Sequence, residues 1–204
     1  MLDVKYAVFG ALENNCYLIT DKKTGKAALV DCTEDSEKMR DFISGADLEY
    51  ILLTHGHFDH IGGVKGIKEL TGAKVVISRE DEPMLASSKH SLAVFCSAEQ
   101  NNTSADIIIS DGDTVTLGES IIKVIATPGH TKGGICYLCG DKLFTGDTLF
   151  FCNCGRTDFP GGSYAEILAS LKKLSSLEGN PAVYPGHDKL STLDFERKNN
   201  PYMK

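Results

Sequence analysis

The apolar residues in the first third of the chain fall in short runs that predict β-strands separated by polar turns. Strands are expected at residues 5–9, 15–20, 26–31 and 50–53. The polar run Asp21-Lys22-Lys23-Thr24-Gly25 would join the second and third strands as a hairpin. A helix is expected after Thr33, whose hydroxyl can cap the first turn. Its apolar face would hold Met39, Phe42 and Ile43.

The remainder of the chain alternates between helical and extended patterns. Apolar residues recur every three positions from Ile61 to Leu70, which predicts a helix although three glycines lower its propensity. Ser163 would cap an amphipathic helix over residues 164–174. We also expect strands at 74–78 and within 107–144, and short helices at 80–86 and 193–198. Residues 87–104 show no regular pattern, so we expect a loop or lid there.

Runs of strands interrupted by helices occur in both halves of the chain. This order indicates an α/β sandwich, in which helices cover two packed sheets. No linker, repeat or low-complexity segment is visible, and the composition is ordinary for a globular protein, with 42% hydrophobic and 24% charged residues. We therefore expect a single domain over residues 1–204.

The most distinctive motif follows the strand at 50–53 and reads His55-Gly56-His57-Phe58-Asp59-His60. Three imidazoles and a carboxylate within six residues are the ligand types that a divalent metal such as zinc requires. Three later turns carry a histidine or an aspartate after an extended apolar stretch, at His130, Asp147 and His187. Strand ends on Gly/Pro turns form a rigid platform, so we expect these side chains to complete a metal site. His90 lies on no such turn and is interpreted as a surface histidine.

Charge and composition exclude several classes of function. The formal net charge is −7 and no Lys/Arg cluster would follow a phosphate backbone, so no nucleic-acid partner is expected. The N-terminus does not resemble a signal peptide and no apolar run approaches a membrane span, which predicts a cytoplasmic protein with no membrane partner. Seven cysteines in such a chain predict reduced thiols. Cys136 and Cys139 would point to opposite faces of one strand, which argues against a redox or metal pair.

Taken together, the four motif segments resemble the metallo-β-lactamase superfamily, with Thr54-His55-Gly56-His57-Phe58-Asp59-His60 followed in order by His130, Asp147 and His187. The resemblance implies an αββα sandwich, two packed mixed β-sheets flanked by helices, over nearly the whole chain. Within the superfamily, the segments that begin at Thr127 and Thr145 are most similar to glyoxalase II (hydroxyacylglutathione hydrolase). Only seventeen residues follow His187, so the chain resembles the short bacterial glyoxalase-II-like proteins, which lack a C-terminal helical region.

The resemblance implies two divalent metal ions, with zinc as the first expectation and iron or manganese as alternatives. The first ion would be held by His55, His57 and His130, and the second by Asp59, His60 and His187. Asp147 would bridge the two ions, and Asp59 would act as the catalytic residue that orients the nucleophile or accepts its proton. Asp31, at a strand end, is a candidate hydrogen-bond partner for a ligand histidine, with a surface turn residue as the alternative.

The implied activity is hydrolysis of a small acyl-thiol substrate, that is, a thioesterase of the hydroxyacylglutathione hydrolase type. Substrate contacts are expected from Phe58, Phe150 and Arg156. The alternatives are plain packing for the two phenylalanines and a structural salt bridge to Asp158 for the arginine. Compared with full-length glyoxalase II, this chain has a short C-terminus without the helical region that covers the site. We therefore expect residues 87–104 to lie at the rim of the metal site, or a second subunit of a homodimer to cover the site.

Two other chemistries stay open. The segment from Cys154 to Phe159 also resembles persulfide dioxygenases, which would use a single iron held by His55, His130 and Asp147. Hydrolysis of another ester or amide class is the third alternative.

Overall fold

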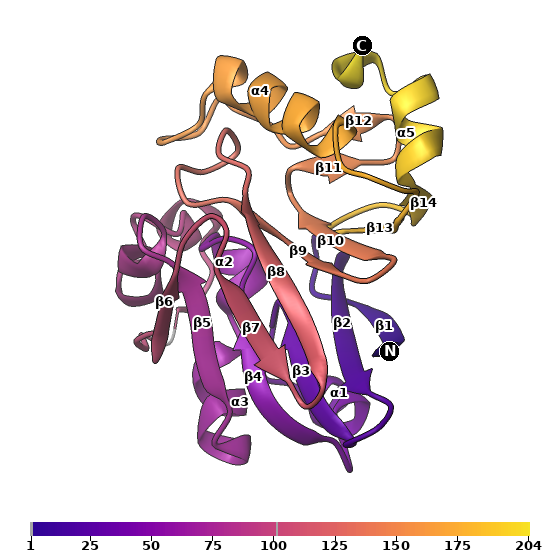
Figure 1. Cartoon of the computed structure of the whole chain (residues 1–204). Helices are drawn as coiled ribbons and strands as arrows, with labels where there is room; N and C mark the ends of the chain where they lie inside the picture. The colour runs from indigo at the N-terminus through magenta and orange to yellow at the C-terminus, as the bar shows by residue number, and fades with distance from the viewer. Residues whose placement is uncertain (1, 101) are drawn as a thin grey trace.

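The computed structural model describes residues 2–100 and 102–204. Met1 and Asn101 lie outside the described residues; the first belongs to the domain predicted over 1–204 and the second to the lid predicted over 87–104. Two six-stranded sheets pack against each other, and helices cover their outer sides (Figure 1). The predicted αββα sandwich is therefore confirmed.

The first sheet has its strands in chain order, β1-β2-β3-β4-β5-β6. The strands are β1 (Leu2–Phe9), β2 (Asn14–Asp21), β3 (Lys26–Val30), β4 (Asp47–Leu52), β5 (Lys74–Ser78) and β6 (Ile107–Ile109). The first two pairings are antiparallel, as the predicted hairpin requires, and β3 to β6 pair in parallel. Parallel neighbours need crossover connections, and the segments that hold the N-terminal helices supply them.

The second sheet has the order β14-β13-β10-β9-β8-β7. Its strands are β7 (Thr114–Leu117), β8 (Ser120–Ala126), β9 (Ile135–Cys139), β10 (Lys142–Gly146), β13 (Ala182–Pro185) and β14 (Ser191–Thr192). A separate small hairpin is formed by β11 (Leu149–Phe150) and β12 (Asn153–Cys154). Strands β10 and β13 run in parallel, so the residues that follow each of them emerge at the same edge of the sheet.

The two predicted C-terminal helices form α4 (Tyr164–Ser175), capped by Ser163 as expected, and α5 (Leu193–Asn199). The N-terminal predictions need three corrections. Helix α1 (Glu37–Phe42) begins after Ser36 rather than after Thr33, since the Ser36 hydroxyl accepts a hydrogen bond from Met39 N at 3.2 Å. Residues 80–86 form a 3₁₀ turn, η1 (Glu82–Ala86), and the expected loop at 87–104 contains a second one, η2 (Ala93–Cys96).

The third correction concerns the single helix expected over 61–70, which is divided into α2 (Phe58–Ile61) and α3 (Val64–Thr71). At the break, Gly62 and Gly63 pack against the backbone of Thr33 and Glu34. A Cβ atom at Gly62 would lie 2.4 Å from Thr33 O, and one at Gly63 would lie 2.3 Å from Glu34 C. These glycines therefore allow close contact with the segment before α1.

Three apolar clusters hold the four layers together. The first packs α1 and α3 against the first sheet, with Met39 and Ile67 fully buried. The second fills the space between the sheets, where the rings of Tyr17 and Phe144 lie 5.4 Å apart. The third packs α4 against the second sheet. Figure 1 shows α4 and α5 at one end of the layer stack and α1 and α3 at the other. No helix in the described part of the chain has the length and apolar character needed to cross a membrane.

Asp21, at the end of β2, links the first sheet to the second. Its carboxylate accepts hydrogen bonds from Ser120 Oγ at 2.6 Å, Thr24 N at 2.9 Å and Lys23 N at 3.1 Å. These hydrogen bonds, that of Ser120 first, lower the pKa of Asp21 well below its ordinary value. Because the folded pKa lies below the unfolded value, the ionised carboxylate stabilises the fold above about pH 4, and this contribution is lost as the pH falls further.

We therefore expect Asp21→Asn to lower the free energy of unfolding near neutral pH, with a difference from the wild type that shrinks below about pH 4. Urea unfolding followed by circular dichroism, at several values from about pH 7 to about pH 3, measures this difference. Asp41→Asn is the matched control, because Asp41 is exposed and should change stability little at any pH. A difference of constant size across this range would contradict the role given to the Asp21 carboxylate.

Candidate metal centre

Seven side chains from both sheets meet at one edge of the sandwich. The loop after β4 and helix α2 carry His55, His57, Asp59 and His60. The second sheet supplies His130 from the turn after β8, Asp147 directly after β10, and His187 from the turn after β13. All these segments follow the carboxyl end of a strand, which explains why residues far apart in the sequence come together.

The ligand atoms form two triads, as the resemblance implied. The first consists of His55, His57 and His130, and the second of Asp59, His60 and His187; in each, the ligand atoms lie within 4.8 Å of one another. Asp147 lies between the triads. Its Oδ1 is 3.3 Å from His60 Nε2, and its Oδ2 is 3.5 Å from His130 Nε2 and 3.6 Å from His187 Nε2. A carboxylate in this position can offer one oxygen to each of two ions.

The alternative triad of a mononuclear iron site stays a prediction: His130 Nε2 lies 3.5 Å from Asp147 Oδ2, and the His55 and His130 rings lie 4.9 Å apart. The third cluster formed by the described residues combines His55 and Asp147 with His60, rather than with His130. His130 is grouped with the other two histidines of the first triad.

Hydrogen bonds to the far nitrogens orient three of the rings. His130 Nδ1 donates to Arg156 O at 2.7 Å, and His187 Nδ1 donates to Leu12 O at 3.0 Å, since a carbonyl oxygen can only accept. His60 Nδ1 donates to Asp31 Oδ2 at 2.8 Å. Each of these bonds fixes the proton on Nδ1 and leaves Nε2 as a lone-pair donor that faces the cluster.

Buried polar atoms without hydrogen-bond partners indicate that the cluster can hold cations. Eight buried side-chain nitrogen or oxygen atoms in residues 2–100 and 102–204 have no hydrogen-bond partner. Four of the eight belong to the cluster: Nε2 of His55, His57 and His60, and Oδ1 of Asp147. Buried polar atoms without partners are destabilising, so their concentration at one point fits a site built for cations. The donor set of imidazole and carboxylate suits zinc, iron or manganese.

The electrostatics keep three of the donors, His55, His57 and Asp147, in the state that ligation requires, whereas the neighbouring carboxylates raise the pKa of His60. Burial, followed by the neighbouring His60, lowers the pKa of His55 well below its ordinary value. Burial and His130 lower the pKa of His57 to about 3. Burial alone would raise the pKa of Asp147, but His60 and the other histidines prevail and lower it to about 2. The two imidazoles are thus neutral and the carboxylate ionised at neutral pH.

Asp31 is buried, with 2% of its surface exposed, so its alternative interpretation as a surface turn residue is wrong. Besides its contact with His60, its carboxylate accepts hydrogen bonds from Thr54 N and Thr54 Oγ1, both at 2.8 Å. The Thr54 hydroxyl in turn lies 3.2 Å from His55 Nδ1. Asp31 therefore holds the start of the metal loop and one predicted ligand at the same time.

Two residues at the site were not found from the sequence. Asn14 is fully buried and donates from Nδ2 to Asp59 Oδ2 at 3.0 Å. Asp81 accepts hydrogen bonds from Gly56 N at 3.1 Å, Thr131 Oγ1 at 2.7 Å and Gly133 N at 2.8 Å, which ties the metal loop to the turn that carries His130. Neither lies in a recognisable motif.

The three predicted substrate residues have different surroundings. Phe58 and Phe150 are half-buried, and the Phe150 ring lies 5.9 Å from the His187 ring at a steep angle. The exposed guanidinium of Arg156 pairs with Asp158 through bonds of 2.7 and 2.6 Å, as its structural alternative predicted. Contact of any of the three with a substrate stays a prediction.

The described part of the stretch at 87–104 contacts the metal loop, as predicted. Phe58, between two of the ligands, donates from its backbone N to Ser91 O at 2.9 Å. Gln100 Nε2 donates to Met84 O at 2.8 Å, which attaches the stretch to η1. The metal site therefore has a wall provided by its own chain on this side.

A two-sheet sandwich flanked by helices, with a His/Asp cluster at the edge where both sheets end, defines a class of metalloprotein. The family model described as "Metallo-beta-lactamase superfamily" matches residues 9–187, and the chain belongs to this superfamily. Its histidine-rich cluster is the metal-binding site typical of the dinuclear centres of the superfamily.

The chain is similar to hydrolases of known name. It is 31% identical over 207 residues to the hydroxyacylglutathione hydrolase GloC of Haemophilus influenzae, covering 95% of this chain and 94% of the relative. It is 33% identical over 177 residues to the probable polyketide biosynthesis zinc-dependent hydrolase BaeB of Bacillus velezensis, covering 85% and 72%. The crystal structure of TTHA1623 in a di-iron-bound form matches with a TM-score of 0.86 at 30% identity, covering 98% of this chain and 100% of the other. The family match, the site and these relatives identify a metal-dependent hydrolase.

Proposed function

We propose that the protein hydrolyses thioesters of small acyl-thiol conjugates at a centre of two divalent metal ions. Zinc is our first choice of metal, supported by the name of the Bacillus relative, and iron is the alternative, supported by the di-iron form of TTHA1623. The thioester class is supported by the name of the Haemophilus relative, a hydroxyacylglutathione hydrolase.

One observation carries the choice of a thioester over an amide. Among the described residues, no lysine, tyrosine or cysteine side chain forms a hydrogen bond with any of the seven predicted ligands. An amine leaving group must be protonated as the carbon–nitrogen bond breaks, which requires a positioned acid. A thiolate leaves without one, so the lack of such an acid in hydrogen-bond contact with the described ligands favours a thioester.

The residues of the chain have distinct parts in this reaction. Bound metal ions would supply a nucleophile from water at neutral pH and stabilise the negative charge that develops on the substrate carbonyl. Asp59, whose carboxylate accepts a hydrogen bond from Asn14 at 3.0 Å, would orient that nucleophile. The described part of the stretch 87–104, which contacts the metal loop at Phe58, would exclude bulk water from one side of the site. All seven cysteines are free thiols, which supports the proposed cytoplasmic location.

The test is a substrate panel assayed with metal-loaded protein of known metal content. We expect about two metal ions per chain and turnover of S-lactoylglutathione or an acyl N-acetylcysteamine thioester that a chelator abolishes. The panel also contains a phenyl ester, a linear amide and a β-lactam. Faster turnover of the amide or lactam would overturn the thioester assignment, and oxygen uptake with glutathione persulfide would replace it with the dioxygenase.

A further inference from the structure

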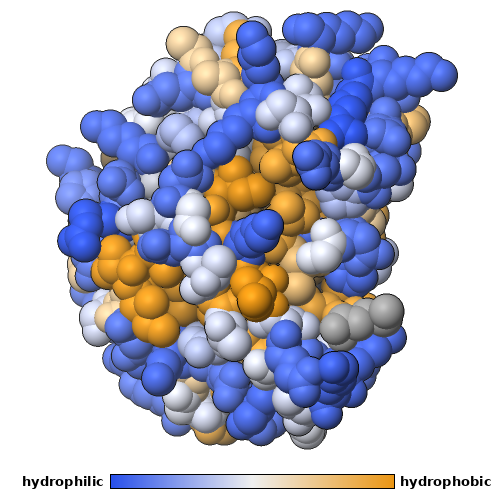
Figure 2. Space-filling view, viewed as in Figure 1, coloured by the Kyte–Doolittle hydropathy of each residue, from blue (hydrophilic) through white to orange (hydrophobic). Residues whose placement is uncertain are grey.

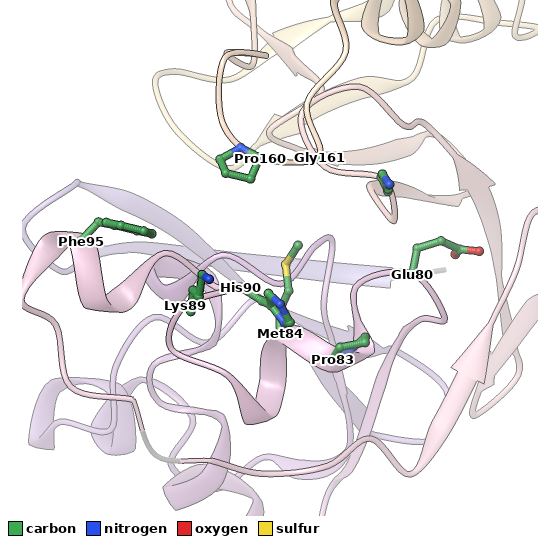
Figure 3. A pocket seen from close by; sticks show the side chains of 9 residues that line it. Glu80, Pro83, Met84, Lys89, His90, Phe95, Pro160 and Gly161 are labelled. Atoms are coloured by element: carbon green, nitrogen blue, oxygen red, sulfur yellow. The ribbon is translucent and has the colours of Figure 1, made fainter.

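A cavity of about 330 Å³ opens between the segment of η1 and η2 and the turn before α4. This volume lies at the lower end of the range for small-molecule sites. Its floor and walls include Pro83, Met84, Phe95 and Pro160, so most of the exposed lining is apolar. Figure 3 shows Pro160 and Gly161 on one side of the cavity, facing η1 and the residues that follow it.

The cavity adjoins the metal centre on the side of the first triad. Met84 packs directly on the metal loop, because a Cβ atom placed on Gly56 would lie 2.6 Å from Met84 Cβ. Phe159, which precedes Pro160, has its ring 6.0 Å from the ring of His57. Lys132, which lines the cavity, is two residues after His130. A substrate whose carbonyl lies at the metal centre can therefore extend into this cavity.

The rim of the cavity carries an excess of positive charge. Lys89 and Lys132 both line it, both are exposed, and neither forms an ion pair with any residue of the described chain. Glu80 is the acidic residue of the lining, and Figure 3 shows it at the end of the cavity opposite Lys89 and His90.

The apolar lining continues onto the surface. Phe95 is 70% exposed and its neighbour Val94 is 55% exposed. Figure 2 shows a further patch of apolar surface at the left of the molecule, over β5 and β6 of Figure 1. Large apolar side chains left open to solvent beside a cavity are typical of a ligand-binding groove.

We propose that this cavity is a substrate subsite that holds an apolar segment of the acyl-thiol substrate together with an anionic group at its end, with Lys89 and Lys132 facing the anion. The inference rests on the proposed function, since it concerns the substrate of the same metal centre. The anion can belong to the acyl half or to the thiol half of the substrate. A carboxylate on either half would present the same negative charge to the two lysines.

Three thioesters of matched apolar length show which half of the substrate carries the anion that the cavity binds. Hexanoyl-N-acetylcysteamine carries no charge, adipoyl-N-acetylcysteamine carries a carboxylate on the acyl half, and hexanoyl-glutathione carries its charges on the thiol half. We expect the double variant Lys89→Gln/Lys132→Gln to lower kcat/KM about tenfold for at least one charged substrate, because each lysine contributes an ion pair of ordinary surface strength. The neutral substrate should change by less than about twofold. The charged substrate that is affected identifies the half of the molecule that occupies the cavity.

Lys123→Gln is the matched control. Lys123 is an exposed lysine on β8 with no part in the cavity, so its replacement removes one positive charge away from the cavity.

Phe95→Ala tests the apolar part of the cavity and should raise KM for all three substrates. The proposal is overturned if the double variant affects the neutral and charged thioesters equally, or if Lys123→Gln alone matches it. An unchanged KM in Phe95→Ala would overturn the apolar half of the proposal.

A binding experiment separates this proposal from the proposed function. If the wild type hydrolyses none of the three thioesters, the thioesterase assignment fails, but the subsite can still be tested with S-hexylglutathione and adipate, which the enzyme cannot cleave. Calorimetric titration of the metal-loaded protein should then show binding of at least one of them, with an affinity that the double variant lowers and Lys123→Gln does not. Absence of binding, or equal binding by all variants, would overturn the subsite.

Discussion

Asp147→Asn is expected to lower kcat/KM of the metal-loaded protein by more than about 100-fold, because replacing even a partner of a metal ligand commonly costs 10–100-fold. The Asp147 carboxylate lies between the two triads, with an oxygen 3.3 Å from His60 Nε2 and another 3.5 Å from His130 Nε2. Asparagine keeps the shape but offers one neutral oxygen and one amide nitrogen that cannot bind a cation. The substitution therefore removes both the bridge and one negative charge from the centre.

Metal content and kinetics together measure this effect. Elemental analysis should show fewer metal ions per chain in Asp147→Asn than in the wild type, and kcat should fall together with kcat/KM on the best thioester. Asp41→Asn is the control, because Asp41 is an exposed residue of α1 and should retain both metal and activity. If Asp147→Asn keeps its metal and its activity, Asp147 is not a bridging ligand.

The second large effect is expected at Asp31, which acts through His60 and Thr54 rather than on the substrate. In Asp31→Asn, the amide oxygen can still accept from Thr54, but the amide NH₂ then faces His60 Nδ1 and donates to it. This would force the His60 proton onto Nε2, which could no longer bind a metal ion. Asp31 has a positive φ of 58°, a conformation that asparagine also adopts readily, so the backbone should be retained.

We therefore expect Asp31→Asn to weaken metal binding about 10–100-fold, with an equal or smaller loss of activity at saturating metal. Titration of the metal-free protein with zinc against a competing chelator measures the affinity. Asp21→Asn is a matched control, because Asp21 is also a buried, hydrogen-bonded carboxylate at the end of a strand of the same hairpin but lies away from the metal site. A loss of stability in both variants with no difference in zinc affinity would show that Asp31 is only structural.

The ligands of the site could be predicted from the sequence because metal chemistry allows few residue types. His130 and His187 lie on Gly/Pro turns after extended stretches, and strands that run in the same direction bring such turns to one edge, so both were recognisable despite their distance from His55 in the sequence. The helix α4 was predicted for a similar reason, since its cap at Ser163 and its apolar face are local features.

Residues that act through tertiary contacts could not be predicted in this way. The division of the helix at Gly62 depends on the backbone of Thr33, which lies almost thirty residues away in the sequence. Asn14 and Asp81 support the metal loop through hydrogen bonds that join different turns, and any polar residue on those turns would look the same in the sequence. For Arg156, the local salt bridge to Asp158 was foreseen because it joins residues two positions apart.

The origin of the ligands in the two sheets has a consequence for the stability of the whole molecule. Neither triad lies within one half of the chain: the first combines two residues before α2 with His130, and the second combines two residues of α2 with His187. Each bound ion would therefore cross-link the two sheets, and it would bind only when they are docked. By mass action, such an ion adds to the free energy that holds the halves together by an amount set by its free concentration. The resistance of this sandwich to opening is thus a property of the metal supply of the cell as well as of the apolar layer between the sheets.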